Sequence, residues 1–191
     1  MPDPVLVFLA GQAAFSVRVA EIGTRQWSAP TPDREWSVAD LVDHLIDEHR
    51  WSAPLLAGAA LEQAARAVRA YGPTREREAA WQEAATSSAA AWSVDGAVQR
   101  TVQLSRGPTP ARGYLQEMIF DLCVHAWDLG RAIGSPHELP EDLVEAAYQV
   151  ARQFGDLSGS GMFDPPVSVP DDAPLLDRLI ALTGRDPHWV P

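Results

Sequence analysis

The sequence predicts an all-α protein, a four-helix bundle with long connections and a short extra helix near its C-terminus. Alanine is abundant and β-branched residues are sparse, which favours helices over a sheet. Apolar residues recur at three- and four-residue steps over several long stretches, and no strands alternate with them. The 191 residues, 46% of them hydrophobic, can bury a core of their own, so we expect a single domain over residues 1–191.

The first helix is predicted over residues 4–23. Phe8, Phe15 and other apolar residues lie on one face of this stretch, and Gly23 can end it as a C-cap. A proline-rich loop follows at residues 29–33, where the chain cannot continue as a helix.

The second helix has the clearest start signal in the chain. Ser37 can cap the first backbone N–H groups, and Asp40 follows three residues later, as in a capping box. Trp36 precedes the cap and can pack on Leu41, one turn into the helix. We expect this helix to continue to about Ala57, before a glycine.

Four further helical stretches have weaker signals. Alanine-rich residues 74–94 predict a third helix with an ill-defined face, and residues 59–71 are helical in part. Residues 140–154 and 173–182 predict two more helices, separated by a long Gly-, Ser- and Pro-rich loop. The stretch 97–104 is compatible with either extended or irregular structure.

The longest helix is predicted to follow Thr109 and Pro110, which fit an N-cap and a first helical residue. Gly134 ends it. Its apolar stripe is the most regular in the chain, and consists of Leu115, Ile119, Leu122, Ala126, Leu129 and Ile133.

Charge and composition exclude several classes of partner. The formal net charge of −11 argues against nucleic acid and anionic membranes, which bind clustered lysine and arginine. No stretch reaches the roughly 18 apolar residues of a membrane span. Cys123 is the single cysteine, so an intrachain disulfide and a cysteine metal cage are impossible. Because residues 1–4 lack the basic start of a signal peptide, we expect a cytoplasmic protein.

Two polar residues of the second helix lie on its apolar face. His44 and Glu48 share a line with Leu41, Trp51 and Leu55, at steps of three and four residues. Polar groups on a buried face must be paired, protonated or bound to a ligand. A histidine in such a place is more often a satisfied core residue than a ligand, so both interpretations stay open on spacing alone.

The longest helix carries a matching polar line beside its apolar stripe. Asp121 and His125 are one turn apart, so their side chains can reach a common point and hold a metal ion together with a third ligand. A simple His–Asp hydrogen bond would also explain the pair. What favours metal binding is that two helices each present such residues inward. His49 lies about 140° around the helix from His44 and cannot share the ion.

The sequence also resembles a known family in three blocks. Residues 36–45, Trp-Ser-Val-Ala-Asp-Leu-Val-Asp-His-Leu, resemble the second-helix signature of the DinB-like superfamily. The most similar branch is the actinobacterial one related to mycothiol-dependent maleylpyruvate isomerase. Residues 121–134 resemble its carboxylate-x-x-x-His-x-x-Asp-Leu block, and residues 175–187 resemble the closing motif of a single-domain subgroup of metal-binding proteins.

The resemblance implies a divalent metal near one end of the bundle, held by His44, Asp121 and His125. Zinc is the favoured ion, with nickel and iron as alternatives. The isomerases have glutamate at the position of Asp121, so the shorter side chain must lie nearer the ion or bind it differently. The resemblance further implies mycothiol as a cofactor, a small-molecule substrate and a homodimer. The isomerase has an additional C-terminal domain for which this sequence is too short, so activity on maleylpyruvate is not carried over.

Three protein ligands leave coordination positions open, as in catalytic metal sites. The first hypothesis is therefore a thiol-dependent transferase or isomerase, in which Glu48 or Glu117 accepts the proton of the thiol. A metal-dependent hydrolase would use the same ligands to activate water. A non-catalytic metal-binding bundle is the third hypothesis. A cavity beside the three ligands would favour the first, and ligands closed off from solvent would favour the third.

Overall fold

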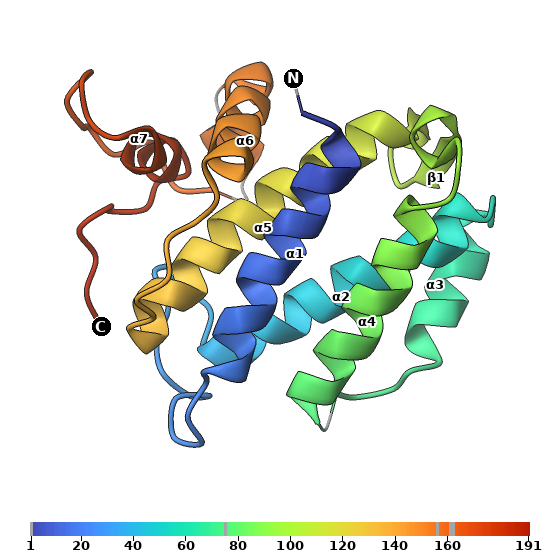
Figure 1. Ribbon diagram of the computed structural model, residues 1–191, viewed down its shortest axis with the longest axis horizontal. Coiled ribbons are helices and arrows are strands. Elements are labelled where there is room, and N and C mark those ends of the chain that lie inside the picture. Colours follow the sequence, from blue (N-terminus) through green and yellow to red (C-terminus); the bar gives the residue numbers. More distant parts are fainter. Residues whose placement is uncertain (1, 75, 156, 161–162) are drawn as a thin grey trace.

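The computed structural model describes residues 2–74, 76–155, 157–160 and 163–191, and in that part the chain is mainly helical (Figure 1). The helices are α1 (Pro4–Ala20), α2 (Val38–Leu56), α3 (Leu61–Arg69), α4 (Arg77–Trp92), α5 (Ala111–Ile133), α6 (Glu141–Phe154) and α7 (Leu175–Leu182), with 3-10 turns at Ala97–Gln99 and Leu157–Ser160 and a hairpin of β1 (Thr101–Leu104) and β2 (Gly107–Pro110). The prediction of an all-α fold is confirmed, apart from this small hairpin.

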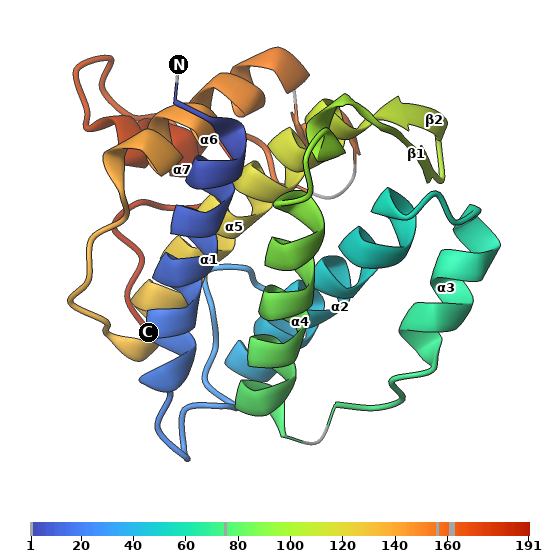
Figure 2. The ribbon, with the colours of Figure 1, turned by 45° about the vertical axis from the view of Figure 1, so that its right-hand side comes forward.

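Helices α1, α2, α4 and α5 surround the main core. Helix α2 packs along α4 and α1 packs along α5, while α1 also contacts α4 and α2 contacts α5. Figures 1 and 2 show α3 beyond α2 on one side, and α6 and α7 beside α5 on the other. Large aromatic side chains fill the centre: the rings of Phe15 and Trp81 meet edge to face with centroids 4.6 Å apart, and Trp92 lies 6.2 Å from Phe8.

The start of α2 agrees with the sequence prediction. The Ser37 side chain accepts a hydrogen bond from the Asp40 N–H, and the Asp40 carboxylate accepts one from the Ser37 N–H at 2.9 Å. This capping box fixes where α2 begins, and therefore which of its residues face the core. Two other helices were predicted too long: α1 ends at Ala20, before Gly23, and α4 covers only the middle of the predicted 74–94 helix.

The hairpin resolves the undecided stretch 97–104 and corrects one prediction. Val102 pairs with Thr109 and Leu104 with Gly107, so the chain turns through Ser105 and Arg106. Thr109 is therefore a strand residue and not an N-cap, and Pro110 takes the N-cap position with extended backbone (φ −56°, ψ 129°). Helix α5 begins one residue later than the Thr-Pro signal predicts, because strand β2 continues up to the start of the helix.

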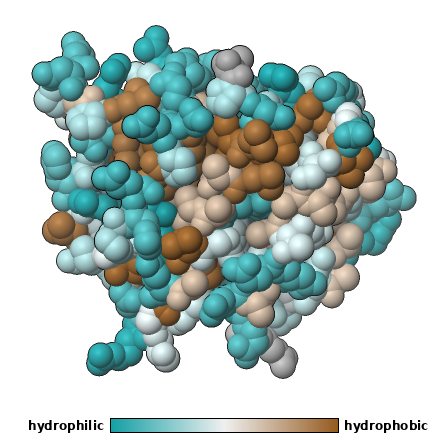
Figure 3. Space-filling model, viewed as in Figure 1, coloured by the Kyte–Doolittle hydropathy of each residue, from teal (hydrophilic) through white to brown (hydrophobic). Residues whose placement is uncertain are grey.

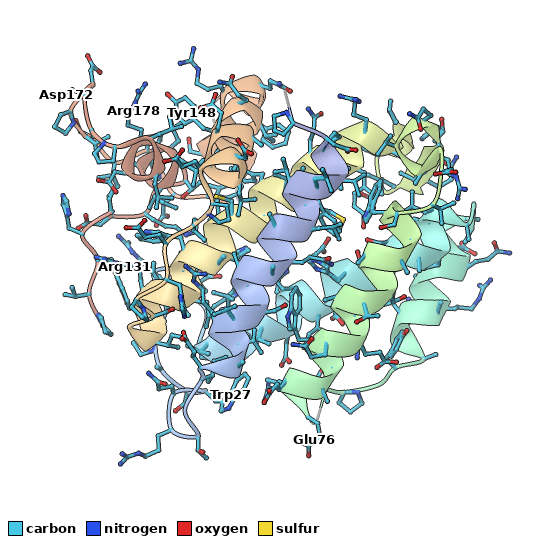
Figure 4. All side chains as sticks on the ribbon, viewed as in Figure 1. Trp27, Glu76, Arg131, Tyr148, Asp172 and Arg178 are labelled. Carbon is cyan, nitrogen blue, oxygen red and sulfur yellow. The ribbon has the colours of Figure 1, made fainter. Side chains whose placement is uncertain are left out.

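The C-terminal segment folds back over α5 and α6. Arg178 of α7 donates a hydrogen bond to the Tyr148 hydroxyl of α6 at 2.7 Å, and Figure 4 shows both side chains between these helices. After α7 the chain turns at Gly184, whose φ is +77°. A Cβ atom there would lie 2.5 Å from the backbone oxygen of Asp164, so only glycine fits.

The visible surface is mostly hydrophilic in Figure 3, and apolar residues gather over the N-terminal half of α1, where Leu6 is 64% exposed. Within the described residues, no helix combines the length and the apolar character needed to cross a bilayer.

We predict that Gly184→Ala lowers the free energy of unfolding by about 3 kcal/mol, because the new Cβ adds a backbone clash to the strain of the positive φ. Gly58→Ala is the matched control: Gly58 also has a positive φ, of +86°, but a Cβ there meets nothing within 4 Å. It should lose only about 1 kcal/mol. Urea unfolding of the two variants measures the difference, and equal losses would rule out the clash.

Candidate metal centre

His44 of α2 meets Asp121 and His125 of α5 where the two helices contact each other. His44 Nε2 lies 3.4 Å from Asp121 Oδ2, and His125 Nε2 lies 3.3 Å from Asp121 Oδ1. One ligand atom from each residue lies within 4.8 Å of the other two, which makes this the one cluster of its kind in the described part of the chain. The structure thus brings together all three residues predicted from the sequence.

The donor set suits a small divalent ion. Donors of a tetrahedral zinc site lie about 3.3 Å apart, since zinc–nitrogen and zinc–oxygen distances are about 2.0–2.1 Å. Asp121 Oδ1 lies close to this separation from both imidazoles, 3.5 Å from His44 Nε2 and 3.3 Å from His125 Nε2. Two imidazoles and one carboxylate are also donors that zinc, iron and nickel accept. The residues therefore fit a metal ion, with a coordination position left for a further ligand.

Trp36 covers the two histidines. Its ring lies 4.7 Å from the His44 ring and 5.3 Å from the His125 ring, measured between centroids. The packing of Trp36 on Leu41 stays a prediction, and its contacts with the two histidines place it at the candidate site as well. Its bulk restricts how far either imidazole can rotate.

A buried carboxylate orients His125 from behind. Asp128 is fully buried, and its Oδ2 lies 3.0 Å from His125 Nδ1. Its other oxygen accepts a hydrogen bond at 2.8 Å from Arg185, which lies after α7 and also binds Asp33 at 2.9 Å. A hydrogen bond from Nδ1 to a carboxylate leaves Nε2 free to bind a metal, so Asp128 sets the tautomer that the site requires.

In the metal-free protein Asp121 and His125 form an ion pair. Burial alone would disfavour the Asp121 carboxylate, but the charges and hydrogen bonds of His125 and His44 hold the pKa of Asp121 well below its usual range. Burial also opposes the His125 imidazolium, yet Asp121 and Asp128 outweigh it and raise the pKa of His125 to about 9. A metal ion must therefore displace a proton from His125.

A pocket of about 480 Å³ lies beside the metal ligands. Asp121 forms part of its wall, together with Glu48 and Glu117, the two predicted proton acceptors. Burial, followed by the nearby charge of Asp121, raises the pKa of Glu48. Glu117 forms an ion pair with Arg106 from the hairpin turn, a residue that the sequence analysis had not singled out.

The other histidines and the cysteine lie away from the metal ligands' donor atoms. His49 is buried, and its Nδ1 donates to the Leu45 carbonyl at 2.8 Å while burial lowers its pKa to about 4. His137 pairs with Glu21 at the surface. Cys123 is fully buried, and burial raises the pKa of its thiol to about 12, as expected of an inert core residue.

We predict that Asp128→Asn weakens zinc binding about 10- to 100-fold, because the neutral amide no longer fixes the His125 ring and its basicity. Competition with a chromophoric chelator measures the affinity. Asp142→Asn, at an exposed carboxylate on α6, is the control and should bind zinc like the unaltered protein. Unchanged affinity in Asp128→Asn would show that His125 does not depend on this contact.

We also predict that zinc affinity rises with pH. The folded-state pKa of His125, about 9, lies above its usual value of 6.5, so a proton competes with the ion throughout this interval. The apparent association constant should increase about tenfold per pH unit between pH 6.5 and 9, and level off above that range. Chelator competition at a series of pH values tests this, and a flat profile would contradict the ion pair.

Comparison with known proteins shows which family the chain belongs to. Residues 8–130 match the family described as mycothiol maleylpyruvate isomerase N-terminal domain. Two uncharacterised proteins of Mycobacterium tuberculosis, from strains CDC 1551 and H37Rv, are each 28% identical over 190 residues, covering 96% of this chain and 98% of theirs.

Two crystal structures share the fold. One is a histidine-to-alanine mutant of mycothiol-dependent maleylpyruvate isomerase, with a TM-score of 0.63 and 14% identity, covering 85% of this chain and 72% of that one. The other is a mycothiol-dependent maleylpyruvate isomerase, with a TM-score of 0.56 and 16% identity, covering 78% of this chain and 66% of that one. Because the family match over residues 8–130 covers more than half of its length, this chain belongs to the mycothiol maleylpyruvate isomerase N-terminal domain family.

Proposed function

We propose that the protein is a metal-dependent transferase or isomerase that acts on a small molecule and uses a low-molecular-weight thiol, mycothiol. The observation that carries the proposal is the position of Asp121, which belongs both to the three-residue ligand cluster and to the wall of the adjacent pocket. A ligand in that pocket would therefore lie directly against the metal centre.

The exposure of the ligands favours a catalytic role over a structural one. The side chains of His44 and Asp121 are each 29% exposed, whereas a structural metal site is closed on all sides. A pocket of about 480 Å³ leaves room for a thiol and a small acceptor. The mainly apolar residues around it favour an organic ligand over a hydrolytic water.

A divalent ion at these residues would lower the pKa of a thiol bound to it, and so supply a thiolate at neutral pH. Glu48 lines the pocket next to Asp121 and takes up the proton that the thiol loses. Burial raises the pKa of Glu48, which makes its carboxylate a stronger base than an exposed glutamate. Glu117 is less suited to this role because Arg106 holds its carboxylate.

Zinc is the ion we propose, because it accepts two imidazoles and a carboxylate without a redox change. The homodimer and the cytoplasmic location expected from the sequence stay predictions.

Metal analysis of purified His44→Ala and His125→Ala tests the centre. The unaltered protein should hold one zinc ion per chain, and each variant should hold little. His137→Ala, which removes a surface histidine paired with Glu21, is the matched control and should keep its zinc. An unaltered protein without stoichiometric metal, or variants that retain it fully, would refute the centre.

The thiol is tested on protein loaded with cobalt in place of zinc. Mycothiol should change the visible absorption of the cobalt protein and raise its melting temperature, and it should have neither effect on the metal-free protein. If mycothiol leaves both readouts unchanged, the thiol-dependent function is wrong even where the metal centre holds.

A further inference from the structure

The segment after α7 reaches the candidate metal centre from behind. Figures 1 and 2 show the chain running from α7 back along the C-terminal half of α5. Arg185 lies in this segment and is only 6% exposed, although a charged arginine is rarely buried unless it is paired. Its partners are two carboxylates from other parts of the chain, Asp128 of α5 and Asp33 of the loop before α2.

The guanidinium of Arg185 bridges these two carboxylates. Its Nε donates a hydrogen bond to Asp128 Oδ1 at 2.8 Å, and one terminal nitrogen donates to Asp33 Oδ2 at 2.9 Å. The guanidinium is planar and stays charged, so the two bonds fix the positions of both carboxylates relative to each other. A lysine carries one nitrogen at the end of a flexible chain and cannot impose this geometry.

The first carboxylate carries the constraint to a candidate metal ligand. Asp128 is fully buried, with one oxygen 3.0 Å from His125 Nδ1 and the other bonded by Arg185. Without Arg185 that second oxygen would lose its charged partner, and the carboxylate would be free to turn away from His125. The imidazole would then lose the contact that directs Nε2 toward Asp121.

The second carboxylate carries the constraint to the residue that covers the histidines. The backbone oxygen of Asp33 accepts a hydrogen bond from the Trp36 N–H at 3.1 Å, which closes a turn between the two residues. A fixed Asp33 therefore fixes where the Trp36 ring lies against His44 and His125, at centroid separations of 4.7 Å and 5.3 Å.

We propose that Arg185 is a positioning residue of the metal centre, and that the segment after α7 completes the centre by holding His125 and Trp36 in place. This role of Arg185 rests on the metal centre of the proposed function. The family match covers residues 8–130, which include the three candidate ligands but not Arg185. The metal centre of this chain therefore depends on a residue outside the matched domain.

A residue that only attaches the segment to the rest of the fold would behave differently, and Arg131 of α5 provides the comparison (Figure 4). Its guanidinium holds the same segment through two hydrogen bonds to the Trp189 carbonyl, of 3.1 Å and 2.7 Å. Among the described residues, these are the hydrogen bonds of its side chain, and neither involves Asp128 or Asp33.

The zinc affinity of folded variants tests the role of Arg185. Arg185→Gln should weaken zinc binding about 10- to 100-fold in competition with a chromophoric chelator. Arg185→Lys retains the charge without the planar fork and should weaken binding about three- to tenfold. Arg131→Gln is the matched control and should bind zinc within about twofold of the unaltered protein, even if its melting temperature falls. Melting curves verify that each variant folds.

If Arg185 acts through Asp128, the losses caused by the two substitutions should not add. Combining Arg185→Gln with Asp128→Asn should weaken zinc binding by at most about threefold beyond Asp128→Asn alone. Full additivity of the two losses would overturn the positioning role.

A second readout uses metal-free protein. Nuclear Overhauser effects between the Trp36 indole and the rings of His44 and His125 should be present in the unaltered protein and in Arg131→Gln. They should be weak or lost in Arg185→Gln, because Asp33 no longer holds the turn that carries Trp36.

Unchanged zinc affinity or unchanged Overhauser effects in folded Arg185→Gln would overturn the proposal. If Arg185→Gln does not fold, Arg185→Lys decides, and an affinity equal to that of the unaltered protein would overturn it. A failure of the proposed function looks different: an unaltered protein that takes up no zinc refutes the metal centre, while the Overhauser effects still show whether Arg185 positions the two side chains.

Discussion

The structure around the candidate metal centre depends on one buried charge. Asp128 has no contact with solvent, and an unpaired carboxylate in such a place is destabilising by several kcal/mol. Arg185 and His125 satisfy it from two sides, and Arg185 also binds Asp33. Because these partners come from α5, from the loop before α2 and from the segment after α7, the ion-pair network determines how three distant parts of the chain meet. Trp36 is brought over the histidines by the same arrangement.

Helix α5 connects this network to the pocket. Tyr114, Glu117 and Asp121 follow one another at steps of three and four residues, so they form one edge of the helix that faces the pocket. His125 is the next residue along that edge and faces His44. Since one helix carries Asp121 and His125 as well as part of the pocket wall, helical geometry sets the distance between the candidate metal centre and the pocket.

Much of this could be predicted from the sequence, because it follows from local periodicity. The inward position of His44 follows from its spacing with Leu41, and the joint reach of Asp121 and His125 follows from one helical turn. Arg185 could not be assigned to Asp128 in this way, since 57 residues separate them and no local rule relates them. The predicted start of α5 was one residue too early, because a Thr-Pro sequence typical of a helix N-cap gives no sign that a paired strand extends to the same point.

The hairpin between α4 and α5 has a consequence for how this scaffold can diversify. Its strands pair with each other, and among the described lining residues it contributes Arg106 alone, at the turn. Changes of length or sequence in that turn would alter the rim of the pocket while α2 and α5, which carry the three candidate ligands, keep their packing. Relatives could thus come to bind different ligands in the pocket through a few residues of the turn, with the cluster of His44, Asp121 and His125 unaltered.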